Sequence, residues 1–220
     1  AVARSSARTG GVIEVRHPLV RHHLTRLRDE RTPPEEFRLL VRRLATLLAY
    51  EATKDLADEQ LDIRTPNCET VGRRLRERIG LVPILRAGLG MVDPVLDLIP
   101  TAEGSHLGVY PDEATAKPVD YYSKIPATGP VDVALIVDPM LATGGSAVAA
   151  LSTLREWGVE TVKLLSIIAS SEGIRAVEDQ FPSTQIYVCA IDPELNDRKF
   201  IIPGLGDAGD RIFNTRREHE

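Results

Sequence analysis

The chain has 220 residues, 43% hydrophobic and 27% charged, with a formal net charge of −5. This size and composition predict one α/β domain with a sizeable core, and the acidic balance argues weakly against a dedicated nucleic-acid binder. No apolar run approaches the roughly 18 residues that a membrane-spanning helix needs, and the isolated Cys68 and Cys189 favour a reducing cytoplasm over a disulfide framework or a zinc site.

Residues 1–11 are small, polar and arginine-bearing, without periodicity and without the apolar segment of a secretory signal. We expect a disordered extension there, followed by a single domain over residues 12–220. A remnant of an organelle transit peptide is an open alternative for this end. Residues 12–15 then predict a short strand, and residues 19–28 predict a basic amphipathic helix.

The next predicted helix begins after Thr32, which forms a capping-box pattern with Glu35. Pro33 occupies a first-turn position where proline is tolerated. Residues 37–48 place their leucines, a valine and a phenylalanine on one broad face. This face is interpreted as part of the intramolecular core, with a subunit interface as the alternative.

Residues 81–85 form an apolar strand that runs directly into Arg86 and two glycines, before an apolar helix over residues 91–99. A positive charge and glycines at the carboxyl end of a strand are typical of an anion site. An arginine on the surface without a ligand is the alternative. Residues 107–110 predict another strand, and the polar, proline-rich stretch 110–130 predicts a lid-like segment near the site, or else a surface hairpin that serves dimerisation only.

Residues 133–137 are apolar and end at Asp138, and a loop leads into a helix over residues 147–157. Two glycines, two hydroxyls and the first turn of the helix all supply donors to an anion. The loop lacks the lysine of a Walker A motif, so a phosphate other than that of a nucleoside triphosphate is predicted. An ordinary strand–helix turn is the alternative. The loop consists of Ala142, Thr143, Gly144, Gly145 and Ser146.

Residues 162–169 and 185–191 predict strands, and residues 172–181 between them predict a helix. Gly158 is expected to cap the C-terminus of the preceding helix over 147–157. This alternation predicts a doubly wound, mostly parallel sheet. The last motif, over residues 200–211, matches the spacing of a dinucleotide-binding turn, but only eleven residues follow Gly209, too few for the rest of that fold. Its glycines expose backbone groups to a small flat ligand, unless it is simply a glycine-rich turn.

Three of these stretches resemble uracil phosphoribosyltransferases, a type I phosphoribosyltransferase family: LRAG at 85–88, DPMLATGGS at 138–146 and PGLGDAGD at 203–210. The resemblance implies that fold, with an N-terminal helical region and a β arm. It also implies transfer of phosphoribose from phosphoribosyl diphosphate (PRPP) to uracil, which gives UMP and diphosphate in pyrimidine salvage. The catalytic residues that it implies are Arg86, Asp138 and Asp207.

The resemblance also implies the ligand contacts of individual residues. The uracil contacts are Ile201, Gly206, Asp207 and Ala208. The PRPP contacts are Arg86, Asp138, Pro139, Met140, Leu141, Ala142, Thr143, Gly144, Gly145, Ser146 and Asp207. From the close approach of a phosphate to the loop, we expect Gly144→Val to abolish PRPP binding with little loss of fold.

Partners follow in the same way. Because the second acidic residue of many type I relatives is Pro139 here, Mg²⁺ is expected to arrive on PRPP without a direct protein site. A homodimer or higher homo-oligomer is implied, GTP is a candidate allosteric activator, and neither a membrane nor a nucleic acid is an expected partner. A pyrimidine-sensing RNA-binding regulator and a catalytically weakened homologue are the alternatives.

One position departs from the family pattern. The arginine that usually follows the tyrosine of the strand before the arm, and that contacts PRPP, is Pro111 here. A charge-assisted contact of this kind is worth about 1.5 to 3 kcal/mol, so its loss is expected to weaken PRPP binding unless Lys117 or Lys124 substitutes for it.

Overall fold

The protein is described here from a computed structural model that covers residues 10–104, 107–111, 118–123 and 129–215, with the backbone alone for 107–111 and 118–123. A parallel sheet with the strand order β1-β11-β10-β8-β4-β5 forms its centre, and β9 pairs with β10 beyond the end of β8. These strands are β1 (Gly11–Glu14), β4 (Ile79–Pro83), β5 (Glu103–Gly104), β8 (Val133–Val137), β9 (Met140–Leu141), β10 (Thr161–Ser170) and β11 (Gln185–Asp192).

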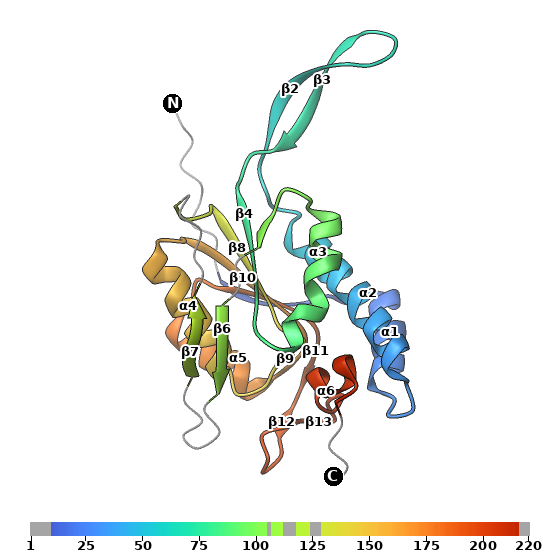
Figure 1. The fold of residues 1–220 in the computed structure, drawn as a ribbon, viewed down its shortest axis with the longest axis vertical. Coiled ribbons are helices and arrows are strands. Elements are labelled where there is room, and N and C mark those ends of the chain that lie inside the picture. Colours follow the sequence, from blue (N-terminus) through green and yellow to red (C-terminus); the bar gives the residue numbers. More distant parts are fainter. Residues whose placement is uncertain (1–9, 105–106, 112–117, 124–128, 216–220) are drawn as a thin grey trace.

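Helices cover both faces of this sheet (Figure 1). One layer consists of α1 (Pro18–Arg28), α2 (Pro34–Ala52) and α3 (Val92–Leu98), the last preceded by the 3₁₀ turn η1 (Ala87–Met91). The other consists of α4 (Gly145–Trp157) and α5 (Ser171–Gln180). The predicted doubly wound, mostly parallel fold is confirmed, and Gly158 ends α4 as expected.

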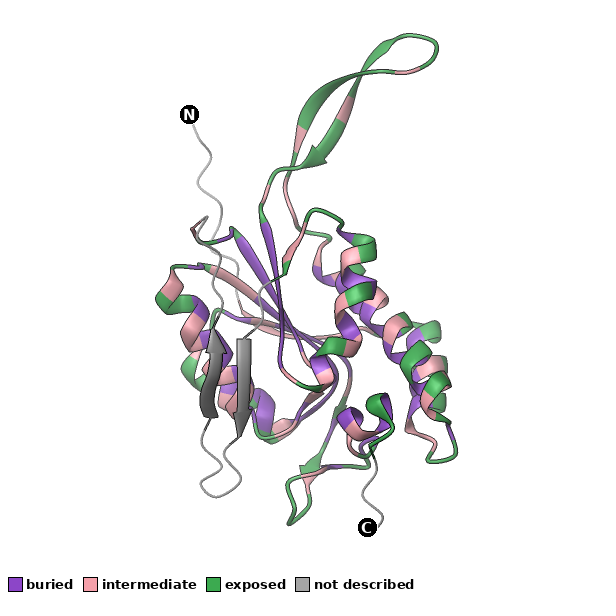
Figure 2. Ribbon diagram, viewed as in Figure 1, coloured by how far each residue is buried: buried purple, intermediate pink, exposed green. Residues whose placement is uncertain are grey.

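The middle strands are apolar on both sides because each face of the sheet carries its own core (Figure 2). Successive residues of β8 alternate between the two cores: Leu135 packs in the cluster beneath α2, whereas Ile136 packs in the cluster beneath α4. The apolar face of α2 is buried in the first cluster. The core interpretation of that face is therefore confirmed.

The predicted capping box at the start of α2 is wrong. The helix begins at Pro34 with Pro33 as its N-cap residue, and no side chain caps it. The hydroxyl of Thr32 instead donates a hydrogen bond to the carbonyl of Arg26, close to the end of α1. A hydrogen bond across the turn from α1 to α2 has therefore taken the hydroxyl that the capping-box spacing assigned to the cap.

Three antiparallel strand pairs lie outside the main sheet in the described part of the chain, and two of them form longer hairpins. The hairpin of β6 (Leu107–Pro111) and β7 (Pro118–Ser123) overlaps the stretch 110–130 expected to form the arm, although β6 begins before it, and β6 contacts α4. The hairpin that projects from the body is another one, β2 (Asp58–Arg64) with β3 (Glu69–Leu75), which was not predicted (Figure 1). Lys117, Lys124 and most of the expected N-terminal extension lie outside the described residues, although Gly11 is already part of β1.

The last part of the chain lies beyond the carboxyl ends of the central strands (Figure 1). Strands β12 (Glu194–Leu195) and β13 (Ile201–Ile202) pair with each other, and α6 (Ala208–Phe213) follows. The stretch 200–211 is therefore only partly a loop, because its last residues form the first turn of α6. None of the described helices is long and apolar enough to cross a membrane.

Candidate active site

The chain changes direction in the sheet between β4 and β8. After β4 it runs through α3 to β5 at one edge, and after β8 it runs through α4 to β10 in the opposite direction. Open α/β sheets bind ligands at such a switch point, beyond the carboxyl ends of the strands. The loop with Arg86 and the loop with Asp138 leave these two neighbouring strands, and the N–H of Ile84 donates to the carbonyl of Val137 at 3.0 Å. The topology therefore brings the two predicted anion loops together.

The second loop presents the amino terminus of α4. Gly144 is the N-cap residue with φ of 84°, and Gly145 and Ser146 are the first two residues of the helix. Their N–H groups have no carbonyl partner one turn earlier, and the positive end of the helix dipole lies among them. A phosphate would accept hydrogen bonds from these N–H groups and balance the positive end of the dipole, so this geometry suits the predicted 5′-phosphate site.

The rest of this motif packs into the protein. Pro139 and Leu141 are buried, and the carbonyl of Pro139 accepts from the N–H groups of Ile167 and Ile168 at 3.1 Å each. The hydroxyl of Ser170 at the end of β10 donates to the carbonyl of Ala142. Residues 139–142 thus hold the loop against β10, and any contact that Pro139 or Leu141 makes with PRPP would come from the backbone.

Asp138 ends β8 at the edge of the core. Its backbone N–H donates to Leu165, and its carboxylate accepts a long hydrogen bond of 3.4 Å from the N–H of Met140. Burial raises the pKa of Asp138 to about 7, and the hydrogen bond from Met140 opposes that shift. A carboxylate with so few partners is suited to accept hydrogen bonds from ligand hydroxyls.

This raised pKa leads to a pH prediction. PRPP would bind the ionised carboxylate preferentially, so its affinity should rise about tenfold between pH 6 and pH 8 and level off above the pKa of about 7. The measurement is titration calorimetry with PRPP across this range. Because PRPP itself titrates nearby, Asp138→Asn serves as the reference, and equal pH profiles for the two proteins would contradict the prediction.

Arg86 extends from the first loop toward the C-terminal helix. Its Nη2 donates to the carboxylate of Asp210 at 2.8 Å, and its Nη1 donates to the hydroxyl of Thr215 at 3.3 Å. A Cβ built on Gly209 would lie 3.2 Å from both Nη2 of Arg86 and Oδ1 of Asp207. The predicted diphosphate ligand and the predicted uracil loop therefore meet at the start of α6.

Asp207 is the N-cap residue of α6, and its carboxylate accepts from the N–H of Asp210 at 2.8 Å. The other predicted uracil contacts surround it in sequence: Ile201 is buried and pairs with Leu195, Gly206 is exposed with φ of 77°, and Ala208 is buried. The structure thus gathers these residues into the segment that runs from β13 to the start of α6.

Three further residues, Asp192, Arg28 and Arg211, anchor this turn and were not predicted. The carboxylate of Asp192, which is 5% exposed, accepts two hydrogen bonds of 2.7 Å from Arg28 and one of 3.0 Å from the N–H of Gly204. Arg28 also donates to the carbonyl of Gly204 at 2.7 Å. Asp192 ends an apolar strand, as Asp138 does, and that pattern could have drawn attention to it.

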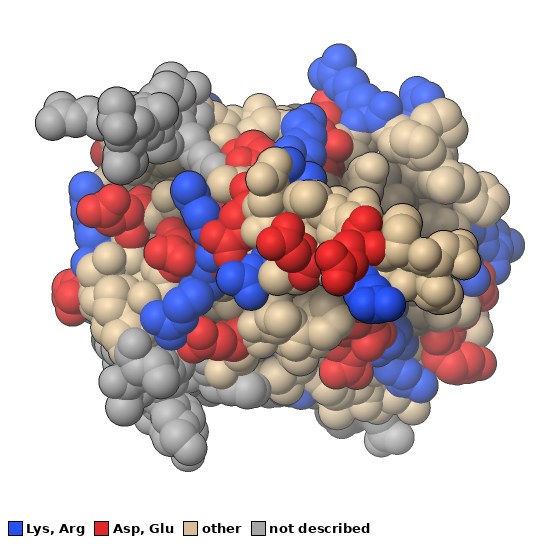
Figure 3. Space-filling model, turned by 90° about the horizontal axis from the view of Figure 1, so that it is seen from above, with Lys and Arg blue, Asp and Glu red and all other residues tan. Residues whose placement is uncertain are grey.

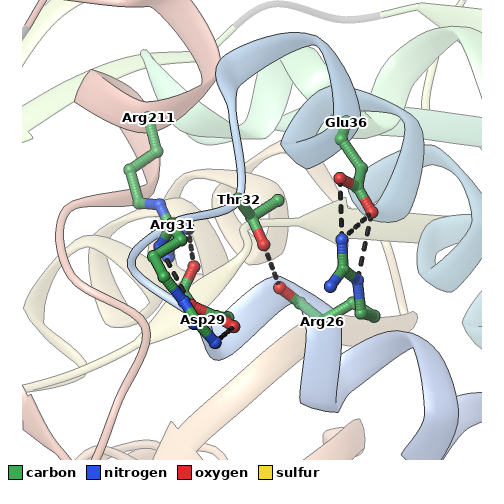
Figure 4. Close-up of polar contacts among 6 residues, drawn as sticks. All are labelled: Arg26, Asp29, Arg31, Thr32, Glu36 and Arg211. Atoms are coloured by element: carbon green, nitrogen blue, oxygen red, sulfur yellow. Dashed lines mark hydrogen bonds and ion pairs between the residues drawn. The ribbon is translucent and has the colours of Figure 1, made fainter.

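Arg211 is the third anchor (Figure 4). Its buried guanidinium donates to the carbonyls of Leu27, Asp29 and Leu205 at 2.7–2.8 Å and lies 4.2 Å above the ring of Phe37. One side chain therefore connects the α1–α2 turn to the C-terminal loop. No motif marks it, because its partners are backbone carbonyls, and two of the three lie more than 180 positions away in sequence.

No group of three or more His, Cys, Asp or Glu side chains that could hold a metal ion occurs in the described part of the chain. At the switch point the acidic donor is Asp138, with Pro139 beside it. This donor set fits a Mg²⁺ ion that keeps oxygen ligands from a phosphorylated substrate.

A doubly wound parallel sheet with a phosphate-type loop after a strand-end aspartate, at its switch point, defines the type I phosphoribosyltransferases. The chain matches the family model described as uracil phosphoribosyltransferase over residues 14–215. It belongs to the uracil phosphoribosyltransferase family, and the resemblance inferred from the three motifs is confirmed.

Known proteins agree with this membership. The chain is 57% identical over 199 residues to a uracil phosphoribosyltransferase of Roseiflexus castenholzii. These residues cover 90% of this chain and 96% of that protein. It is 49% identical over 208 residues to the uracil phosphoribosyltransferase of Geobacillus kaustophilus, with 94% and 100% covered. Among solved structures, the AQ2163 protein of Aquifex aeolicus is similar with a TM-score of 0.88 and 37% identity, over 93% of this chain and 99% of that one.

Proposed function

We propose that the protein transfers phosphoribose from PRPP to uracil, producing UMP and diphosphate, and so acts in pyrimidine salvage. The observation that carries this proposal is the meeting of the phosphate-type loop, Arg86 and the C-terminal turn at one switch point in a chain of this family. Each of the three would take a different part of the two substrates.

The residues then have distinct roles. The N–H groups at the start of α4 hold the 5′-phosphate, and Asp138 accepts hydrogen bonds from the ribose hydroxyls. Arg86 binds the diphosphate, whose negative charge increases as the bond to C1 breaks and the ribose becomes oxocarbenium-like. N1 of uracil, held by the turn around Asp207, forms the new bond to C1 as the bond from C1 to the diphosphate breaks, and the N1 proton is released to solvent. Catalysis rests on positioning and charge stabilisation.

Mg²⁺ bound to PRPP would supply further charge neutralisation on the departing diphosphate. Asp138 would lie near that complex, because it would bind the ribose of the same PRPP molecule. GTP as an activator is part of the proposal on family grounds, and it is tested by UMP formation with and without GTP at subsaturating PRPP.

Selectivity for uracil would come from backbone groups of the C-terminal turn. Uracil offers a carbonyl at C4 and an N3–H, whereas cytosine reverses that pattern and would leave buried groups unpaired, with a discrimination on the order of 10⁴ to 10⁵. The deciding assay compares UMP formation from uracil with nucleotide formation from cytosine, orotate and hypoxanthine. Activity with another base and not with uracil would refute the proposal.

We propose a homodimer that uses the projecting β2–β3 hairpin. Ion pairs cross its strands, including Arg74 with Glu59 at 2.6 Å. Most of the hairpin is exposed (Figure 2), and its exposed residues include large apolar ones. A two-stranded hairpin is only marginally stable alone in water, so these side chains favour a partner surface. They are Leu61, Ile63, Val71 and Leu75, with exposures of 39–56%.

Val71→Asp is expected to convert the dimer into a monomer, because a charge would be buried at the interface without a partner. Light scattering during gel filtration measures the mass. Asn67→Asp in the exposed turn of the hairpin is the control for added charge. A wild-type protein that is already monomeric, or a Val71→Asp protein that stays dimeric, would contradict the use of this hairpin.

The RNA-binding regulator finds less support. The arginines that could form a basic face are mostly paired with carboxylates, as Arg26 is with Glu36 and Arg78 with Glu103. Positive and negative side chains alternate on the face that Figure 3 shows. RNA binding with a steep salt dependence would favour that alternative.

A further inference from the structure

Three side chains form a compact group between the Arg86 loop and α6. Besides the bonds from Arg86 to Asp210 and Thr215, the hydroxyl of Thr215 donates to the same Asp210 oxygen at 2.7 Å. The ring of Phe213 lies beneath the guanidinium, 5.7 Å from its centre. Arg86 thus bonds to residues more than 120 positions further along the chain.

This group leaves Arg86 available for a ligand. The bonds to Asp210 and Thr215 use two of the five guanidinium N–H donors, one on each terminal nitrogen. The side chain of Arg86 is 54% exposed, so without these contacts it would sample many rotamers. Holding a long cation in one orientation before the ligand arrives removes an entropy cost from binding.

We infer that Asp210, assisted by Thr215, is a positioning residue that holds Arg86 ready for the diphosphate of PRPP. The inference rests on the proposed function and assigns a second role to α6. The start of this helix lies at the uracil turn, and its third residue orients the side chain that binds the other substrate. One short helix thereby sets the position of the diphosphate-binding arginine relative to the uracil contacts.

The inference predicts which kinetic constants change. Asp210→Ala should weaken PRPP about tenfold, whereas the Michaelis constant for uracil should stay within about twofold. Asp210→Asn keeps an oxygen acceptor and should restore most of the affinity, to within about threefold of wild type. Thr215→Val should have a smaller effect than Asp210→Ala.

A double-mutant cycle separates positioning from simple loss of structure. PRPP affinity is measured by calorimetry without uracil in the wild type, Arg86→Ala, Asp210→Ala and the double variant, with inorganic diphosphate as a second probe. Once Arg86 is absent, Asp210→Ala should change affinity less than about twofold. Arg38→Met, which removes the bond of 2.9 Å from Arg38 to the carbonyl of Ile212, loosens α6 elsewhere and should give effects that add to those of Arg86→Ala.

The outcomes are distinguishable. Tighter PRPP binding in both Asp210 variants would mean that the carboxylate competes with the diphosphate, and would overturn the inference. So would equal effects of Asp210→Ala with and without Arg86, or equal changes for uracil and PRPP. A wild-type protein that binds PRPP but forms no UMP would refute only the proposed function, because the binding cycle would still be measurable. Failure of the wild type to bind PRPP would overturn both.

Discussion

A Gly145→Val protein is expected to bind PRPP about a hundredfold more weakly than the wild type while keeping its fold. A Cβ built on Gly145 meets no protein atom closer than 3.9 Å, the hydroxyl of Thr143. The added side chain would instead occupy the space in front of the helix terminus, where the 5′-phosphate is proposed to bind. Losing two charge-assisted hydrogen bonds at about 1.5 kcal/mol each gives a reduction of this size.

Stability separates this effect from misfolding. The free energy of unfolding of Gly145→Val should lie within about 1 kcal/mol of wild type, because the position is helical and open. Gly104→Val is the control, since a Cβ there meets no atom within 4 Å and the residue belongs to the edge strand β5. The control should bind PRPP normally. Normal PRPP binding by Gly145→Val itself would contradict the phosphate assignment.

Gly144 is a poorer test position than the sequence indicated. Its φ of 84° is unfavourable for valine, and a Cβ there would lie 2.9 Å from both the carbonyl oxygen of Gly173 and the Cβ of Ala176 on α5. The expectation that Gly144→Val would leave the fold intact is therefore wrong. Loss of binding in that variant could follow from displacement of α5.

Replacing Arg211 with methionine is expected to lower the free energy of unfolding by about 3 kcal/mol and to raise the Michaelis constant for uracil. The change leaves three carbonyl oxygens without their buried donor, at about 1 kcal/mol or more for each, and also removes the contact with Phe37. Uracil binding should suffer because the carbonyl of Leu205 lies directly before the Gly206–Asp207 turn.

Urea denaturation and initial-rate kinetics measure these two effects. Arg31→Met is the matched control, because Arg31 pairs with Asp29 on the surface of the same turn and is 84% exposed (Figure 4). Exposed pairs contribute little, so the control should change stability by less than about 1 kcal/mol. Equal stability of Arg211→Met and Arg31→Met would show that Arg211 is not an anchor.

The missed elements have a common explanation. The hairpin over residues 58–75 alternates charged and apolar side chains but buries neither face in the body, so a rule that looks for one buried face finds no clear strand. The hydroxyl of Thr32 could either accept from a backbone N–H at the start of α2 or donate to the carbonyl of Arg26. The capping-box spacing predicts the first bond, and the structure has the second. In both cases the rule considers one element alone. The partner of the Thr32 hydroxyl lies in the preceding helix, and the exposure of the hairpin depends on how the body of the protein leaves it uncovered.

The sequence by itself determined the buried strands and the phosphate-type loop, because apolar runs and glycine–hydroxyl turns are local signals of burial and backbone geometry. The resemblance of three short motifs then identified the family. Only the tertiary structure decided that Arg86 meets Asp210 and that Arg211 connects two turns. These contacts join residues more than 100 positions apart, and their partners are chosen by strand order and helix packing, which no local pattern contains.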